Sequence, residues 1–216
     1  RRVHAFLKRY GISIAFLQET HIWGDCIQAL RKKWRGQIYS TSYSGYALGV
    51  LIWVAPGTQF VHKAHKIDEE GRFVVQYGSI EGLDICLINI YAPNVDTPLF
   101  IPKLVATAAD YLTTDTILMG DCNCVLNGMM DRDPPKSNTK PGITGTLIDM
   151  MAGLGLIDIW RQQHPSEKCY SCYTPTAGTH SRTDYSLVSS DIADRVQKIM
   201  YIPRYISDHS PLLISM

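Results

Sequence analysis

The chain has 216 residues, of which 45% are hydrophobic and 19% are charged, and its formal net charge at pH 7 is +1. This composition is that of an ordinary globular protein, and no apolar run approaches the roughly 20 residues that a membrane-spanning helix needs. The N-terminal Arg1-Arg2-Val3-His4 also lacks a signal-peptide core, so an intracellular, non-secreted chain is expected. The small net charge argues against a domain that binds nucleic acid through a large basic excess.

The spacing of apolar residues and the positions of Gly and Pro predict the following elements in chain order. They are a helix at 3–9, a strand at 12–17, a helix at 26–34, strands at 46–54, 73–78 and 84–91, a helix at 102–112, a strand at 116–119, an exposed loop at 131–141, a helix at 144–151, and strands at 169–174, 183–188, 201–205 and 211–216.

Strands outnumber helices in this pattern, and the two kinds of element do not alternate regularly. Such an order favours an α+β fold with packed sheets over a doubly wound parallel sheet. There is no internal repeat, low-complexity tract or long linker, so we expect a single domain over residues 1–216.

Six cysteines leave two interpretations open. Cys122-x-Cys124 and Cys169-x-x-Cys172 together supply four thiols, which could bind structural zinc. Only the second spacing suits zinc, and a chain of this size does not need disulfides to fold. Reduced thiols are therefore the preferred prediction.

Polar and acidic residues gather where the predicted strands begin or end. Because strand termini pack together at the edge of a sheet, we expect these groups to form a cleft of carboxylates and amides, which suits an oxygen-binding cation such as Mg²⁺. The groups are Gln18-Glu19-Thr20, Tyr91-Ala92-Pro93-Asn94, Gly120-Asp121-Cys122-Asn123, Ser181-Arg182-Thr183-Asp184-Tyr185 and Ser207-Asp208-His209.

Each of these groups has an ordinary explanation when taken alone. An acid after a strand is usually a solvated turn residue, Gly-Asp-x-Asn usually forms a turn, and Ser-Asp-His could be a helix cap or a surface loop. Their joint occurrence, in this order, is what favours a functional site.

The ordered set resembles the endonuclease/exonuclease/phosphatase superfamily, which includes apurinic/apyrimidinic endonucleases and deoxyribonuclease I. The resemblance is strongest to the endonuclease domains of LINE-type, non-LTR retrotransposons, and it extends to residues 155–161 and to His164-Pro165. It implies a four-layer α/β/β/α sandwich of two mixed sheets flanked by helices.

Two departures from the family pattern are visible. The usual phenylalanine of Gly-Asp-Phe-Asn is Cys122 here, an apolar replacement that should be tolerated. The family's first strand, which carries an asparagine next to the metal, has no counterpart in this chain. We therefore expect an N-terminally truncated domain that is weakly active or inactive on its own.

The resemblance also implies a role for individual residues, with Mg²⁺ as the cofactor and Mn²⁺ as the alternative ion. Either Asp121 or His209 could be the general base. The connection 174–180 resembles the one that enters the DNA minor groove in this family, and an ordinary hairpin loop is the alternative. The implied catalytic residues are Asp121, Asn123, Asp184, His209 and Tyr91, the metal ligands are Glu19 and Asp208, and the substrate-binding residues are Asn94, Ser171, Ser207, Thr179 and His180.

The function that the resemblance implies is nicking of double-stranded DNA to leave a 3′-hydroxyl that primes reverse transcription. It implies a reverse transcriptase domain in the same polyprotein, synthesis in the cytoplasm and action in the nucleus. Two alternatives remain open: a phosphatase or sphingomyelinase-like esterase of the same fold, and a catalytically dead retrotransposon relic that acts as a binding module.

Overall fold

A six-stranded sheet forms the centre of the computed structural model, which describes residues 2–22, 24–43, 48–137, 139–204 and 207–216. Neighbours β6 and β7 are parallel and the other paired neighbours are antiparallel, so the sheet is mixed as expected. In spatial order the strands are β4 (Phe60–Ile67), β5 (Phe73–Ile80), β6 (Leu83–Tyr91), β7 (Thr116–Asp121), β12 (Asp184–Ser189) and β9 (Leu156–Asp158).

A second β layer packs against one face of this sheet, and it consists of two antiparallel pieces. One has the order β1 (Ile14–Leu17), β3 (Val50–Val54), β2 (Gln37–Thr41), and the other pairs β13 (Lys198–Tyr201) with β14 (Leu212–Ser215). Buried side chains from both pieces and from the large sheet, including Ile52, Leu87 and Ile199, form one hydrophobic cluster between the layers.

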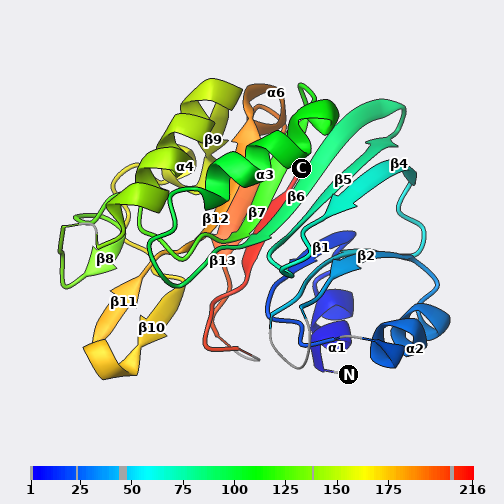
Figure 1. The fold of residues 1–216 in the computed structure, drawn as a ribbon, viewed down its shortest axis with the longest axis horizontal. Helices are drawn as coiled ribbons and strands as arrows, with labels where there is room; N and C mark the ends of the chain where they lie inside the picture. Colours follow the sequence, from blue (N-terminus) through cyan, green and yellow to red (C-terminus); the bar gives the residue numbers. More distant parts are fainter. Residues whose placement is uncertain (1, 23, 44–47, 138, 205–206) are drawn as a thin grey trace.

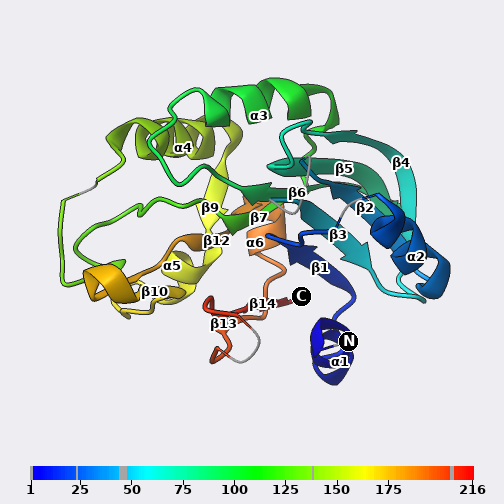
Figure 2. The ribbon, with the colours of Figure 1, turned by 60° about the horizontal axis from the view of Figure 1, so that its bottom comes forward.

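Helices cover the two outer faces (Figures 1 and 2). On the large sheet, α3 (Phe100–Ala108) and α4 (Pro141–Leu154) pack against β-strand residues, and the 3₁₀ turn Ala109–Tyr111 follows α3. On the small sheet, α1 (Arg2–Arg9) and α2 (Asp25–Lys33) pack around Trp53. The predicted α/β/β/α layering is therefore confirmed.

A hairpin projects from the body of the molecule, at the lower left of Figure 1. Strands β10 (Cys172–Thr174) and β11 (Thr179–Ser181) flank the 3₁₀ turn Pro175–Ala177, and β11 also pairs with β8 (Arg132–Asp133). Asp131 is 0% exposed, so the predicted exposed loop at 131–141 is wrong at its beginning.

Besides the short strands β8, β9 and β11, the pattern missed the longer strands β2 and β4, for a physical reason. Strand β4 is an edge strand whose residues after Phe60 are largely exposed, so its polar composition resembled a connection. Strand β2 has only five residues and begins soon after α2, which ends at Lys33. The predicted strand limits at residues 46 and 205 lie outside the described residues.

Short elements complete the fold near the carboxyl end of the chain. Helix α5 (Ile159–Gln163) starts where Asp158 accepts a hydrogen bond from Arg161 N, and helix α6 (Ser190–Ala193) follows β12. None of the described helices is long and apolar enough to cross a membrane.

Candidate active site

Sheet register places three of the predicted residues in one row across β6, β7 and β12. Tyr91 is the register partner of Asp121 in the parallel pair, and Asp121 is the partner of Asp184 in the antiparallel pair. Adjacent partners in a sheet lie about 5 Å apart. The row runs along the edge where β6 and β7 end and β12 begins, as the strand-terminal polar groups predicted.

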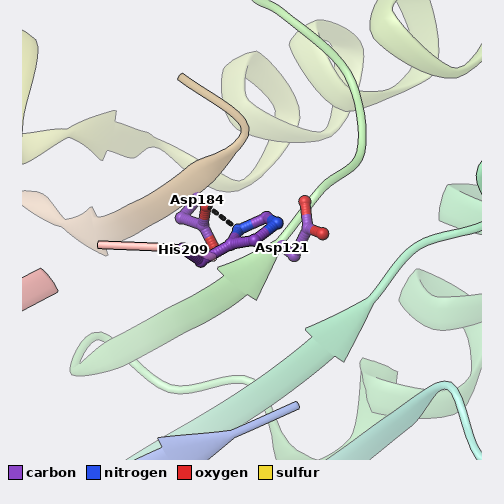
Figure 3. Close-up of side chains that lie close together, drawn as sticks. All are labelled: Asp121, Asp184 and His209. Atoms are coloured by element: carbon purple, nitrogen blue, oxygen red, sulfur yellow. Dashed lines mark hydrogen bonds and ion pairs between the residues drawn. The ribbon is translucent and has the colours of Figure 1, made fainter. Parts of the chain in front are cut away.

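His209 joins this row from the other end of the chain. Its Nδ1 lies 2.7 Å from Asp184 Oδ2, and ligand atoms of Asp121, Asp184 and His209 all lie within 4.8 Å of one another. Figure 3 shows the imidazole ring between the two carboxylates. A bridge between His209 and Cys172 at β10 holds the backbone there.

Burial and charge shift the ionisation of this cluster. Burial, and next the charge of Asp184, raise the pKa of Asp121 well above its usual range, although the His209 charge and hydrogen bonds from Asn123 N and the Thr183 hydroxyl oppose that shift. Burial alone would lower the pKa of His209, but the hydrogen bond to Asp184 and the surrounding negative charge outweigh it and raise the pKa to about 9. The cluster therefore favours a protonated imidazole.

Asn123 adopts a left-handed backbone (φ 49°), which is uncommon for a residue other than glycine. Its N–H donates to Asp121 Oδ1 (2.8 Å), and its Nδ2 donates to the carbonyl of Ala92 (2.9 Å). The ammonium of Lys140 donates to the carbonyl of Asn123. These contacts fix the side chain beside Asp121, and Lys140 is a neighbour of the site that the motifs did not indicate.

Glu19 follows β1 and also has a left-handed backbone (φ 48°). The carboxylate of Glu19 lies close enough to act on the Tyr91 hydroxyl, so the acid reaches the row of strand residues. Burial, and then hydrogen bonding and charge from Glu19, raise the pKa of Tyr91 above its ordinary value. Tyr91 therefore stays a neutral phenol at neutral pH.

Asn89 ties β1 and the segment that follows it, which contains Glu19, to the large sheet. Its Oδ1 accepts from Gln18 Nε2 (2.6 Å), and its Nδ2 donates to the carbonyls of Leu17 (3.0 Å) and Leu51 (2.9 Å). Because Asn89 is fully buried, these bonds replace those it would make with water. They set the position of Glu19 relative to Tyr91.

Asp208, Ser207 and Asn94 lie on exposed loops beside the cluster. The hydroxyl of Ser207 donates to Asp208 Oδ1 (3.2 Å) and accepts from His209 N (3.1 Å), so it shapes the turn that presents His209. Asn94 comes three residues after Tyr91 and is exposed. All three are accessible to a substrate.

Ser171 is not accessible, and the prediction that its hydroxyl lines the pocket needs correction. The residue is 0% exposed, and its Oγ accepts from Thr183 N (3.0 Å) and Asp184 N (3.1 Å). Its hydroxyl therefore holds the start of β12, and with it the Asp184 carboxylate, in place.

Thr179 and His180 lie on the projecting hairpin and not among the carboxylates. The Thr179 hydroxyl donates to the carbonyl of Ala177 (3.1 Å). The ring centroids of His180 and Tyr173 lie 4.5 Å apart, and the guanidinium carbon of Arg204 lies 5.9 Å from the Tyr173 centroid. Any contact of these two residues with substrate would be made away from the reacting group.

A buried charge network beneath the site was also missed. Arg182 is 1% exposed, and its guanidinium donates to both carboxylate oxygens of Asp131 (2.9 and 3.0 Å) and of Asp158 (3.1 and 2.7 Å). Arg161 adds a further bond to Asp131 (2.6 Å). The sequence did offer one signal: Arg182 lies two residues before Asp184, in a segment that is buried. A buried arginine needs acidic partners.

The donor set fits a hard cation. Carboxylates of Asp121, Asp184 and Asp208 act on the imidazole of His209, and Glu19 acts on Tyr91, the register partner of Asp121. Oxygen ligands of this kind are those that Mg²⁺ prefers. The six cysteines are free, and within the described part of the chain no cysteine belongs to a group that could hold a metal. The preference for reduced thiols over zinc is consistent with this arrangement.

Comparison with known proteins gives the following matches. No family model matches the chain. The chain is 25% identical over 220 residues to the uncharacterized 149 kDa protein of transposon TX1 from Xenopus laevis, and it spans only 17% of that protein's length.

Among solved structures, the AP endonuclease LMAP from Leishmania major superposes with a TM-score of 0.77 and 20% identity, over 97% of this chain and 80% of that one. The endonuclease domain of TRAS1, a telomere-specific non-LTR retrotransposon, superposes with a TM-score of 0.71 and 14% identity, over 99% and 90% of the two chains. The chain thus has the fold of AP endonucleases and of a LINE-type endonuclease domain, which confirms the resemblance drawn from the motifs.

Proposed function

We propose that the chain is a metal-dependent DNA endonuclease of a LINE-type retrotransposon, which nicks double-stranded DNA and leaves a 3′-hydroxyl that primes reverse transcription. The observation that carries the proposal is the convergence of ligand atoms of Asp121, Asp184 and His209 within 4.8 Å of one another, next to Tyr91 and the Glu19 carboxylate that acts on its hydroxyl. The similarity to a transposon protein and the shared fold with the TRAS1 domain support this choice of substrate.

Hydrolysis of a phosphodiester requires that a water lose a proton, that charge on the phosphoryl oxygens be neutralised, and that the leaving oxygen be stabilised. Glu19 and Asp208 would hold Mg²⁺, with Mn²⁺ as the alternative ion. When bound, the ion supplies Lewis-acid stabilisation of the leaving 3′ oxygen.

Asp184 and His209 form the charge-neutralising pair in this proposal. The carboxylate accepts a hydrogen bond from the Nδ1–H, which orients the ring and keeps the imidazole protonated at neutral pH. The Nε2 proton is then available to a phosphoryl oxygen.

Asp121 is the residue best suited to accept the proton from water. A base works best when its pKa lies near the working pH, and burial together with the charge of Asp184 raises the pKa of Asp121 in that direction. The His209 pKa of about 9 makes the imidazole a poorer base at neutral pH.

Neutral donors complete the arrangement. Tyr91 keeps its phenolic proton because its pKa is raised, and Asn123 and Asn94 carry amide N–H groups. Preorganised donors aimed at developing charge stabilise a transition state without reorganisation. We assign these three residues to the scissile phosphate and its oxygens.

The partners in this proposal are double-stranded DNA and a reverse transcriptase domain in the same polyprotein, with action in the nucleus. The much greater length of the TX1 protein supports a polyprotein context. The projecting hairpin, with Thr179 and His180, would contact DNA beside the cut, where shape rather than base identity is sensed.

A substrate panel tests the proposal. Supercoiled plasmid, sphingomyelin vesicles and an inositol phosphate are each incubated with the chain, and with the longest open reading frame that encodes it, in Mg²⁺, Mn²⁺ or EDTA. The expected result is an open-circular plasmid only with a divalent ion, with ends that a DNA polymerase extends without treatment. Turnover of the lipid or the inositol phosphate but not of DNA would establish the esterase alternative, and DNA binding without cleavage would establish a catalytically dead module.

A further inference from the structure

Arg72, which no motif indicated, lies against the residue that ends β6 beside the carboxylates. Its guanidinium carbon is 5.4 Å from the centroid of the Tyr91 ring, and its Nη1 donates to the carbonyl of Ala92 (3.5 Å). Its own carbonyl accepts from Tyr91 N (2.7 Å). Side chain and backbone of Arg72 therefore both contact the segment that carries Tyr91.

The position of the Tyr91 ring matters because the hydroxyl at its far end lies close to Glu19. A contact at the tip of a phenol leaves the ring free to tilt about that contact. A cation over the ring face is attracted by the negative quadrupole of the ring, which limits the tilt. The carbonyl of Ala92 holds the guanidinium at that place.

Arg72 is itself held by a tight turn. Its N–H donates to Asp68 Oδ2 (3.1 Å), and Gly71, with φ 73°, donates its N–H to the carbonyl of Asp68 (3.1 Å). Asp68 is 3% exposed, and its other carboxylate oxygen lies 2.8 Å from the ammonium of Lys103. Lys103 thus pairs with the charge of Asp68, while Arg72 contacts Asp68 through its backbone N–H and its guanidinium lies over the Tyr91 ring.

We infer that Arg72 is a positioning residue for Tyr91: its guanidinium holds the phenol so that the hydroxyl stays directed at Glu19 and at the phosphate. The inference rests on the proposed function, and it adds a residue that acts through Tyr91 without touching the substrate.

The chain offers a matched control for this contact. The ammonium of Lys63 lies 5.1 Å from the centroid of the Tyr77 ring, at the exposed edge of the sheet on β4 and β5. Lys63→Met removes a contact of the same kind that has no connection to the site. It should leave both the nicking rate and the Tyr91 signals unchanged.

The kinetic test is a double-mutant cycle on plasmid nicking with Arg72→Met, Tyr91→Phe and the double variant. Arg72→Met should lower kcat roughly 10- to 100-fold while KM changes little, because misplacing a catalytic group costs rate. In the Tyr91→Phe background the same substitution should cost much less, since coupled residues are not additive. Arg72→Lys, which keeps a cation over the ring, should recover part of the loss.

Two outcomes would overturn the inference. Additive losses in the double variant would show that Arg72 does not act through Tyr91. A slope of log affinity against log salt that becomes shallower by about 1 in Arg72→Met would show instead a direct contact with a DNA phosphate.

A readout without substrate separates this inference from the proposed function. In protein with ¹³C-labelled tyrosine rings, Arg72→Met should shift or broaden the Tyr91 signals, assigned through Tyr91→Phe, and Lys63→Met should not. Such a shift in a protein that cuts no substrate would refute the endonuclease proposal and retain the positioning contact. Unchanged Tyr91 signals in an active enzyme would refute the contact alone.

Discussion

Asp121 and Asp184 are direct cross-strand partners in the antiparallel pair of β7 and β12. Like charges in such positions repel, so the arrangement costs stability unless other groups compensate. Here His209 bonds Asp184, and the backbone N–H of Asn123 bonds Asp121. A carboxylate pair kept at a strand terminus despite its cost is typical of a functional site.

The first prediction concerns the His209 imidazole in metal-free protein. It should titrate at about 9, and Asp184→Asn should lower that pKa, because the hydrogen bond and the charge of Asp184 are lost while burial still acts. A raised pKa in the folded state stabilises the fold fully below pH 6.5, and this stabilisation is lost as the pH rises through about 9. An NMR titration of the imidazole measures both values, and an unshifted pKa in Asp184→Asn would contradict the pairing.

The second prediction is that Asp121→Asn makes the fold more stable and the enzyme less active. At pH 8 without metal, Asp121→Asn should raise the melting temperature, because it removes a buried carboxylate whose ionisation the fold disfavours. It should also reduce nicking by roughly 10²- to 10⁴-fold, the usual contribution of a general base. Thermal unfolding and the nicking rate are compared with Asp149→Asn, an exposed change on α4 that should alter neither. A variant that cuts at the unmutated rate would remove Asp121 as the base.

The third prediction concerns the buried network beneath β12. Arg182→Met leaves Asp131 and Asp158 without their main partner, and should lower the free energy of unfolding by about 3–5 kcal/mol. Arg195→Met breaks the ion pair between Arg195 and Asp115. Because the Arg195 side chain is 44% exposed, this loss should lower the free energy of unfolding by at most about 1 kcal/mol. Urea unfolding measures both, and equal costs would show that the network contributes no more than a surface pair.

The strand-terminal residues could be predicted from the sequence because the signal is local. Glu19, Tyr91 and Asp121 each follow an apolar run, and such runs end at the sheet edge. Arg182 and Asp131 could not be paired, since they are 51 residues apart and their contact depends on how the hairpin folds back. The local sequence pattern does not show that Arg182 and Asp131 come within hydrogen-bonding distance of each other.

The burial of individual polar groups also could not be predicted from the sequence. Ser171 lies in a segment of mixed polarity, and only the packing of β11 and β12 over it shows that its hydroxyl faces inward. The strand at 116–119 was expected to end at Gly120, yet Gly120 lies inside β7, where the backbone of β6 approaches closely.

The fourth prediction follows from that close approach. A Cβ added at Gly120 would lie 2.1 Å from the carbonyl oxygen of Ile90, and the φ of 142° also disfavours a side chain. Gly120→Ala should therefore destabilise the fold by about 3 kcal/mol or more. Gly145→Ala, in α4 with open space around it, should stabilise the protein by about 0.5–1 kcal/mol. Thermal unfolding distinguishes the two, and a neutral Gly120→Ala would refute the packing at this edge.

The central claim is that the residues around Glu19 form one metal-dependent phosphodiesterase site, and Glu19→Gln tests it most directly. Glu81→Gln is the matched control, because Glu81 is also exposed and also has a left-handed backbone (φ 51°), but lies in the turn between β5 and β6. The measurement is the initial rate of plasmid nicking with and without Mg²⁺, with both variants checked for an unchanged circular dichroism spectrum. We predict that Glu19→Gln abolishes Mg²⁺-dependent nicking while Glu81→Gln cuts at the unmutated rate. Mg²⁺-dependent nicking by Glu19→Gln at the unmutated rate would contradict the account.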